Sequence, residues 1–155
     1  MKSVKIASFL LIIGLNFLFL NHLSAQKGAD AIVGTWLNQD KDAHIAIEKK
    51  GNKYYGKLVW LKFPIDDETK KPKLDKHNPD SKLKSRPVQN LEILSNFVFD
   101  SSDNEWNDGD IYDPKSGKTY SCYMVLNNPD ELKVRGYIGF SMIGRTNIWT
   151  RVKGK

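Results

Sequence analysis

Few side chains in this sequence have the chemistry to act as a nucleophile, a base or a metal ligand. Cys122 is the single cysteine, and His44 and His77 are the histidines that follow the first 25 residues. None of the three stands in a Gly-x-Ser-x-Gly or similar nucleophile context, and their spacing matches no zinc signature. The sequence leaves enzymatic activity open but favours a protein with no catalytic residue, no metal and no cofactor.

The stretch DSSDNEWNDGD (residues 100–110) carries enough carboxylates to raise the question of a calcium site. A calcium loop of the helix–loop–helix type needs the spacing D-x-[DN]-x-[DN]-G and a glutamate at its end. Asp100, Asp103, Asp108 and Asp110 do not follow that spacing. We interpret the stretch as a hairpin turn with solvated carboxylates.

Aromatic and cationic residues near the centres of the expected strands are stronger candidates for a binding site. A lipid-like ligand needs an apolar wall, and its carboxylate needs a cation such as Arg135 in LKVRGYIG. The candidate ligand-binding residues are Arg135, Tyr137, Tyr120, Lys118, Tyr54 and Trp60. The aromatic residues could equally fill the interior of a small barrel, and both interpretations stay open.

Strands must position these residues, because the sequence is β-like almost throughout. In KYYGKLVWLKF, for example, a period of two places Tyr54, Leu58 and Trp60 on one face. The expected strands are 34–38, 44–50, 53–63, 91–99, 105–113, 119–127, 131–140 and 144–152. They predict an all-β fold, a single antiparallel up-and-down β-barrel of about eight strands.

Residues 62–89 interrupt this pattern as a long polar loop with four prolines. The loop contains eight lysine or arginine residues and five aspartate or glutamate residues, a net charge of +3. Loops of this length are usually lids, binding loops or disordered segments. Two interpretations remain: a solvated loop over one barrel end, or a basic lid that attracts an anionic head group.

The first 25 residues are predicted to be a signal peptide. Lys2 and Lys5 precede an apolar run from Ile6 to Leu20, and small Ser24 and Ala25 precede Gln26, the expected mature start. The run is shorter than the roughly 20 residues of a membrane-spanning helix, so we expect cleavage and no integral span. The mature chain, residues 26–155, is then one exported domain, periplasmic or secreted.

Charge and cysteine content narrow the range of partners. Loss of Lys2 and Lys5 with the signal peptide lowers the formal net charge from +6 to +4, too small to favour nucleic acid as a partner. A single cysteine rules out an intramolecular disulfide, and Cys122 is expected to be a buried strand residue. Packing must therefore stabilise the domain.

The segment GTW (Gly34–Trp36) resembles the first strand of lipocalins and other calycins. In that group a tryptophan closes one barrel end and an arginine of the last strand stacks on it. The resemblance implies structural closure by Gly34, Trp36 and Arg151, with Arg145 as the reserve partner. Stacking of a guanidinium on an indole is also favourable in its own right.

A second resemblance runs in order from about Ile32 to Val152. The blocks NPD…L…RP, IYDPKSGKTY, VRGYIG and GRTNIWTR together are similar to the secreted bacterial family called domain of unknown function 2147. That resemblance implies export and a calycin-like barrel, and it implies no established activity.

Two functions from different classes follow. The first is an exported, non-enzymatic barrel that binds a small hydrophobic or amphiphilic, lipid-like ligand, which could be an anionic amphiphile. The alternative is an envelope protein-interaction module with a filled barrel that acts through the basic loop 62–89. A filled interior would favour the second function, and the oligomeric state is not predicted.

Overall fold

The computed structural model describes residues 28–139 and 143–154, and strands dominate this part of the chain. The strands are β1 (Gly34–Leu37), β2 (Ala43–Lys50), β3 (Lys53–Leu61), β4 (Glu92–Asp100), β5 (Glu105–Asp113), β6 (Lys118–Asn128), β7 (Glu131–Tyr137) and β8 (Gly144–Arg151). Two short 3-10 helices are η1 (Asp30–Ile32) and η2 (Ser81–Leu83). No helix in the two described ranges is both long and apolar enough to cross a bilayer. The predicted signal peptide, residues 1–25, lies outside these ranges.

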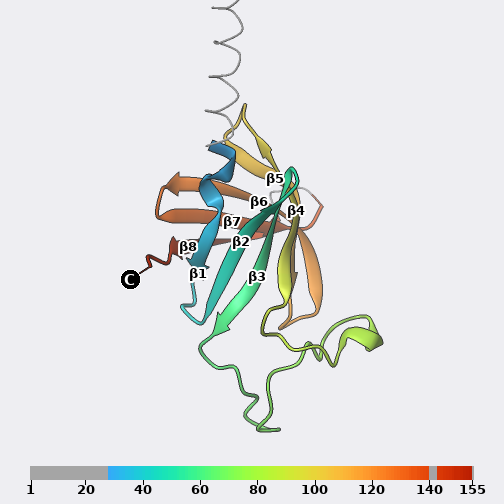
Figure 1. Cartoon of the computed structure of the whole chain (residues 1–155). Coiled ribbons are helices and arrows are strands. Elements are labelled where there is room, and N and C mark those ends of the chain that lie inside the picture. The colour runs from blue at the N-terminus through green and yellow to red at the C-terminus, as the bar shows by residue number, and fades with distance from the viewer. Residues whose placement is uncertain (1–27, 140–142, 155) are drawn as a thin grey trace, which may run out of the picture. The chain divides into compact units, whose positions relative to one another are not determined.

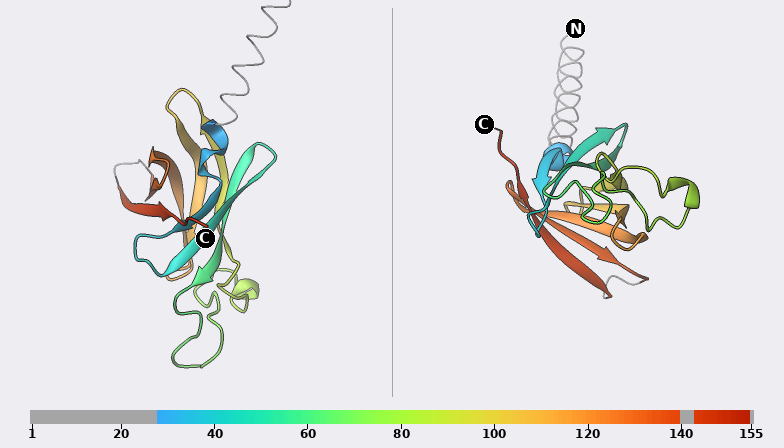
Figure 2. Two further views of the ribbon diagram at one scale, coloured as in Figure 1. Left: turned by 60° about the vertical axis from the view of Figure 1, so that its left-hand side comes forward. Right: turned by 90° about the horizontal axis from the view of Figure 1, so that it is seen from below.

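The eight strands form one closed antiparallel barrel (Figures 1 and 2). Each strand pairs with the next one along the chain, and β8 returns to pair with β1. The closing register joins Trp36 to Arg151 and Leu37 to Thr150. The predicted all-β, up-and-down barrel of about eight strands is therefore confirmed.

The barrel has two different ends, a closed end and an open end. At the closed end lie the start of β1, the turns after β2, β4 and β6, and the end of β8. At the open end lie the connections after β1, β3, β5 and β7, including the long connection 62–91. The barrel therefore carries its longest connection at the open end.

Large side chains fill the interior toward the closed end. The largest buried ones are Trp36, Trp106, Tyr54 and Phe97. Two inward-facing glycines make room for this packing: a Cβ atom on Gly109 would overlap the Phe97 ring, and one on Gly56 would lie 2.7 Å from Leu94 Cδ1. Protein interiors have this close-packed character, so this half of the barrel is a core and not a container.

The interior is less tightly covered toward the open end. Ile111 pairs with Tyr120, and Gly136 pairs with Arg145, all on the inward side of their strands. Ile111, Tyr120 and Gly136 are half-buried, and Arg145 is exposed. The barrel thus changes from a packed core at one end to a shallow, partly solvated mouth at the other.

A β-bulge corrects the predicted face of Trp60. Ile45 pairs with Leu58, but His44 pairs with Trp60, so β3 contains one extra residue between these two pairs. A bulge of one residue moves the following side chains to the opposite face of the sheet. Trp60 therefore lies outside the barrel, on the same side as His44, and the two rings are 4.5 Å apart between centroids.

Candidate functional site

The connection between β3 and β4 is an ordered structure with two parts. Its first part, residues 63–74, forms a short two-stranded ribbon that we call the finger; Ile65 pairs with Pro72 in it. Its second part, residues 75–88, returns along the outer face of the barrel and is called the clasp segment. Figure 1 shows the finger extending beyond the open end of the barrel.

Asp75 is the centre of the hydrogen bonds that fix the clasp segment to β5. Its side chain is fully buried, and its Oδ1 accepts a 2.6 Å hydrogen bond from the Tyr112 hydroxyl. Its Oδ2 accepts hydrogen bonds from Asn78 Nδ2 at 2.8 Å and Arg86 Nε at 2.9 Å, and Arg86 Nη2 is 2.9 Å away. A guanidinium and two neutral donors thus compensate the buried charge.

Tyr112 connects this cluster to the barrel wall. Its hydroxyl also accepts a 3.1 Å hydrogen bond from Asn78 Nδ2, and the Arg86 guanidinium carbon lies 5.7 Å from its ring centroid. Burial, followed by the hydrogen bond to the Asp75 carboxylate, raises the pKa of Tyr112 above its ordinary value of 10.0. The hydroxyl therefore stays protonated and remains a donor at neutral pH.

The local sequence explains the shape of the clasp segment. Asn78 Oδ1 accepts the Asp80 backbone N–H at 2.9 Å, and Asp80 Oδ1 accepts the Lys82 N–H at 2.9 Å to cap η2. The Asp75 N–H donates to the Arg86 carbonyl at 3.0 Å, which closes the segment on itself. Asn and Asp favour such local turns through these side-chain bonds. The NPD and RP blocks thus build one structural unit.

A glycine on the β5–β6 turn allows the clasp segment to approach the barrel. Gly117 has a φ of +71°, and a Cβ atom there would overlap the His77 carbonyl. Only glycine combines this φ with such a close backbone contact. The glycine of the IYDPKSGKTY block is thus explained by the conformation of the turn and by the contact of Gly117 with the clasp segment.

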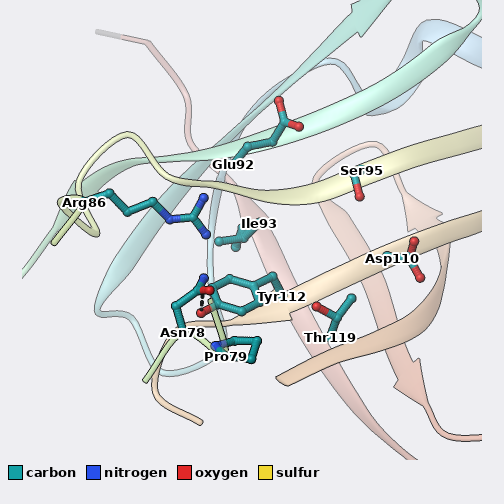
Figure 3. Close-up of a pocket in the computed structure, with 9 residues that line it drawn as sticks. All are labelled: Asn78, Pro79, Arg86, Glu92, Ile93, Ser95, Asp110, Tyr112 and Thr119. Carbon is teal, nitrogen blue, oxygen red and sulfur yellow. Dashed lines mark hydrogen bonds between the residues drawn. The ribbon is translucent and has the colours of Figure 1, made fainter. Parts of the chain in front are cut away.

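An open cavity of about 320 Å³, accessible to solvent, lies between the clasp segment and the outer face of β4, β5 and β6 (Figure 3). Its lining residues are Asn78, Pro79, Arg86, Glu92, Ile93, Ser95, Asp110, Tyr112 and Thr119. Ser95 pairs with Asp110, and Tyr112 pairs with Thr119, so the cavity floor is a regular patch of three adjacent strands. Side chains on paired strands are held at fixed spacing, so the floor is preformed.

Three polar side chains of the cavity remain available to a ligand. Within the described ranges, no side chain makes a hydrogen bond or ion pair with the side chains of Ser95, Asp110 or Thr119. By contrast, Arg86 is engaged by Asp75, and Glu92 accepts a 3.0 Å hydrogen bond from Lys50 Nζ. The cavity therefore presents one carboxylate and two hydroxyl groups beside the Tyr112 ring. This set suits hydrogen bonding to a small polar molecule.

The residues predicted to close one end of the barrel, Gly34, Trp36 and Arg151, lie at the closed end, whereas the reserve candidate Arg145 does not. Trp36 is fully buried, its Nε1–H donates to the Ile32 carbonyl at 2.8 Å, and the Arg151 guanidinium carbon lies 4.1 Å from its ring centroid. Gly34 has a φ of +134°, and a Cβ atom there would lie 2.9 Å from Arg151 Nη1. Arg145 stands at the opposite end of β8 and does not contact Trp36.

Arg135 and Tyr137 lie on the outer face of the barrel, not in its interior. They alternate along β7 with buried Leu132 and Val134, which face inward. Arg135 Nη1 donates to Thr146 Oγ1 at 2.9 Å, and the Tyr137 ring lies 6.3 Å from that of Tyr123. The hypothesis that Arg135 pairs with a carboxylate inside the barrel is therefore replaced by a surface position.

The other four candidate ligand residues are not brought together either. Tyr54 belongs to the packed core and meets Trp106 edge to face at 6.4 Å between centroids. Trp60 lies outside, beside His44. Tyr120 faces the open end from inside, and Lys118 stands exposed at the start of the same strand. Only Tyr120 and Lys118 thus remain candidates for a ligand at the mouth.

The sequence interpretation missed the cluster of Asp75, Asn78, Arg86 and Tyr112. Asp75 and Tyr112 are 37 positions apart, so no local pattern connects them. The available signal was the NPD…RP block itself, whose Asn, Pro and Asp residues are typical of ordered turns.

The family model described as "Uncharacterized protein conserved in bacteria (DUF2147)" matches residues 34–151, which include all eight strands. The chain belongs to this family. A solved structure, protein HP1028 from the human pathogen Helicobacter pylori, described as belonging to the lipocalin family, is similar to this chain. The TM-score is 0.67 and the sequence identity 23%, with 79% of this chain and 83% of that chain covered. At this identity the similarity shows a shared fold, so this DUF2147 member has a lipocalin-like barrel. No curated protein sequence gave a significant match.

Proposed function

We propose that this DUF2147 protein is an exported, non-enzymatic binding protein whose barrel is a scaffold for the cavity under the clasp segment. The observation that carries the proposal is the set of three free polar side chains, Ser95, Asp110 and Thr119, on the floor of that cavity. Its ligand is a small neutral molecule rich in hydroxyl groups, about the size of a monosaccharide. The cavity volume of about 320 Å³ lies at the small end of ligand pockets, roughly 300–1,000 Å³.

The arrangement of acceptors supports this ligand class. A carboxylate such as Asp110 accepts hydrogen bonds from two neighbouring hydroxyl groups, and Ser95 and Thr119 each add a donor and acceptor. The charges of Arg86 and Glu92 are already compensated by Asp75 and Lys50. A neutral polar ligand therefore meets hydrogen-bonding groups without a second uncompensated charge.

Several features support a non-enzymatic role. His44 lies against the Trp60 ring in a tilted arrangement, and His77 belongs to the clasp segment. Burial raises the pKa of the Cys122 thiol to about 12, so it is a poor nucleophile. Export is supported by the predicted signal peptide, residues 1–25, and would place the protein in the periplasm or outside the cell.

The test is titration calorimetry of the purified protein against a panel of neutral monosaccharides and polyols. We expect at least one to bind, and Asp110→Asn to weaken it about tenfold or more, since a hydrogen bond to a charged group contributes about 1.5–3 kcal/mol. Asp103→Asn, which changes an exposed carboxylate on the β4–β5 turn, is the matched control. The proposal fails if nothing in the panel binds, or if both variants bind equally well.

A second candidate is a small hydrophobic or amphiphilic ligand at the open end of the barrel. The half-buried positions of Ile111, Tyr120 and Gly136 favour it, because inward-facing side chains are accessible to solvent there. The lipocalin-like fold is also compatible with it. The packed closed half restricts such a ligand to the mouth.

A fluorescent fatty acid distinguishes this second candidate from the cavity. Binding at the mouth should be weakened by Tyr120→Ala, whose side chain faces inward, and unaffected by Tyr123→Ala on the outer face. Equal affinity of both variants, or loss of binding in Asp110→Asn, would exclude the mouth as the site.

A further inference from the structure

The finger has an apolar face that the rest of the described structure leaves uncovered. Backbone hydrogen bonds from Asp66 N to the Lys71 carbonyl at 2.8 Å and from Lys73 N to the Pro64 carbonyl at 2.9 Å frame the pair Ile65–Pro72. Further along the same strand, Leu74 pairs with Pro87 of the clasp segment. Side chains alternate between the two faces of such a ribbon, and residues directly opposite share a face.

Ile65, Pro72 and Leu74 therefore share one face of the finger, and Phe63 precedes them at its base. Phe63 is 62% exposed, Ile65 45% and Leu74 43%, and Pro72 is also exposed. Single exposed apolar residues are ordinary, but a contiguous row on a projecting element marks an interaction surface. This apolar row needs a partner that can cover it.

The finger is held in its shape without that partner. Asp66 Oδ1 accepts the backbone N–H groups of Glu68 at 3.1 Å and Thr69 at 2.9 Å, and Lys70 N donates to the Asp66 carbonyl at 2.9 Å. Lys70 takes the positive φ of 55° that the turn requires. The apolar face is thus presented before binding, which lowers the entropy cost of docking.

Lysines border the apolar face at its base. Lys62 Nζ lies 5.5 Å and Lys73 Nζ 6.0 Å from the centroid of the Phe63 ring. Lys71 lies next to Pro72, whereas the acidic Asp67 and Glu68 stand at the far tip. Apolar side chains with lysines at one edge match the border between acyl chains and phosphate groups, because lysine stems are apolar and their ends are charged.

We infer that the finger docks on the surface of an anionic phospholipid bilayer. Phe63, Ile65 and Leu74 enter the border of the acyl region, while Lys62 and Lys73 contact lipid phosphates. The finger lies flat on the bilayer, so its acidic tip is not buried. This inference does not depend on the ligand proposed for the cavity, whose polar lining lies on the clasp segment and the outer face of β4–β6.

An environment-sensitive dye tests the inference at the finger itself. Cys122 is 1% exposed and burial raises its pKa to about 12, so a dye attached to Ile65→Cys in the full chain labels one position. We expect a blue shift and brighter emission with phosphatidylglycerol vesicles and little change with phosphatidylcholine vesicles. The control is the same dye on Ile143→Cys, a 71% exposed position outside the finger, which should not respond.

A substitution gives the second measurement. The double variant Phe63→Ser and Ile65→Ser should sediment with phosphatidylglycerol vesicles at least tenfold more weakly than the unchanged protein. The control double variant Ile138→Ser and Ile143→Ser should sediment like the unchanged protein. Any vesicle binding by the N-terminal segment is the same in all variants and does not affect the comparison. An unresponsive dye at position 65, an equal response at 143, or equal response to both lipids would overturn the inference. If the finger binds a protein partner instead, the dye at position 65 will not respond to either kind of vesicle.

Discussion

At the scale of single residues, Asp75 is the group on which the clasp segment depends. Asp75→Asn should lower the free energy of unfolding by about 2 kcal/mol or more, because hydrogen bonds to a charged group contribute about 1.5–3 kcal/mol each. It leaves the Arg86 guanidinium without its counter-charge. Urea unfolding followed by circular dichroism measures the change. Asp67→Asn, on the exposed finger tip, should stay within about 0.5 kcal/mol of the unchanged protein; similar losses for both would contradict the role of Asp75.

Tyr112 should make the stability of the clasp depend on pH in the alkaline range. Its pKa in the folded protein is raised above 10.0, mainly by burial and then by the Asp75 carboxylate. The unfolded tyrosine therefore ionises first, so the stabilisation is complete below about pH 10 and is lost as pH rises through the folded pKa. The difference in unfolding free energy between the protein and Tyr112→Phe should shrink from pH 8 to pH 11. A constant difference would show that the pKa of Tyr112 is the same in the folded and the unfolded protein, and that neither burial nor Asp75 raises it.

Arg151 should stabilise the closed end through both its ring contact and its hydrogen bonds. It lies over Trp36, and it donates to the Pro129 carbonyl at 2.6 Å and the Val33 carbonyl at 3.1 Å. Arg151→Ala should cost about 1–3 kcal/mol of unfolding free energy, combining the cation–π contact and these bonds. Arg145→Ala, at the exposed open end, is the control and should cost less than about 0.5 kcal/mol. Thermal and urea unfolding measure both losses. A larger loss for Arg145→Ala than for Arg151→Ala would refute the role of Arg151 at the closed end.

At the scale of elements, the packing of β5 against β4 should not tolerate an added methyl group at Gly109. Gly109→Ala places a Cβ atom into the Phe97 ring and should destabilise the barrel by about 1–3 kcal/mol through overpacking. Phe97→Leu in the same chain should recover part of that loss, because the smaller side chain leaves room for the methyl group. A double-mutant cycle from urea unfolding measures the coupling. Simple addition of the two losses would mean that Gly109 is not needed for space.

The elements also show how far the sequence could predict the structure. Alternation and turn residues were sufficient for eight strands, and Gly34, Trp36 and Arg151 indicated the closed end. The face of Trp60 was predicted wrongly, because one bulge residue in β3 reverses every later side chain. Arg135 was a candidate partner for a ligand carboxylate, but a period of two does not say which face is inside, and the residue lies on the outer face.

The connection 62–91 was harder to predict, because its structure depends on distant partners. Its charge and prolines indicated a loop with a role, but the hydrogen-bond partner of Asp75 is Tyr112 on β5, 37 positions further along the chain. The candidate cavity has the same origin, since Ser95, Asp110 and Thr119 come from three different strands. Contacts of this range leave no periodic trace in a single sequence.

At the scale of the whole molecule, the closed barrel separates its two proposed binding surfaces from its core. β8 pairs with β1, so each strand has two neighbours and the sheet can open only by breaking a complete ladder. The cavity uses the outer wall, and the finger extends from the open end (Figure 2). The proposed contacts with a ligand and a membrane therefore lie outside the packing around Trp106 and Phe97.

The single cysteine reports whether the barrel opens as one unit. Cys122 is 1% exposed on β6, and burial raises its pKa to about 12, so a thiol reagent at pH 8 should react only after global unfolding. Gly109→Ala should speed the reaction about tenfold for each 1.4 kcal/mol that it destabilises the protein. Ser101→Cys, in the exposed β4–β5 turn, should react at once and serves as the accessible control. Labelling of Cys122 as fast as this control, without denaturant, would mean that the β5–β6–β7 wall opens locally and that the barrel is not one cooperative scaffold.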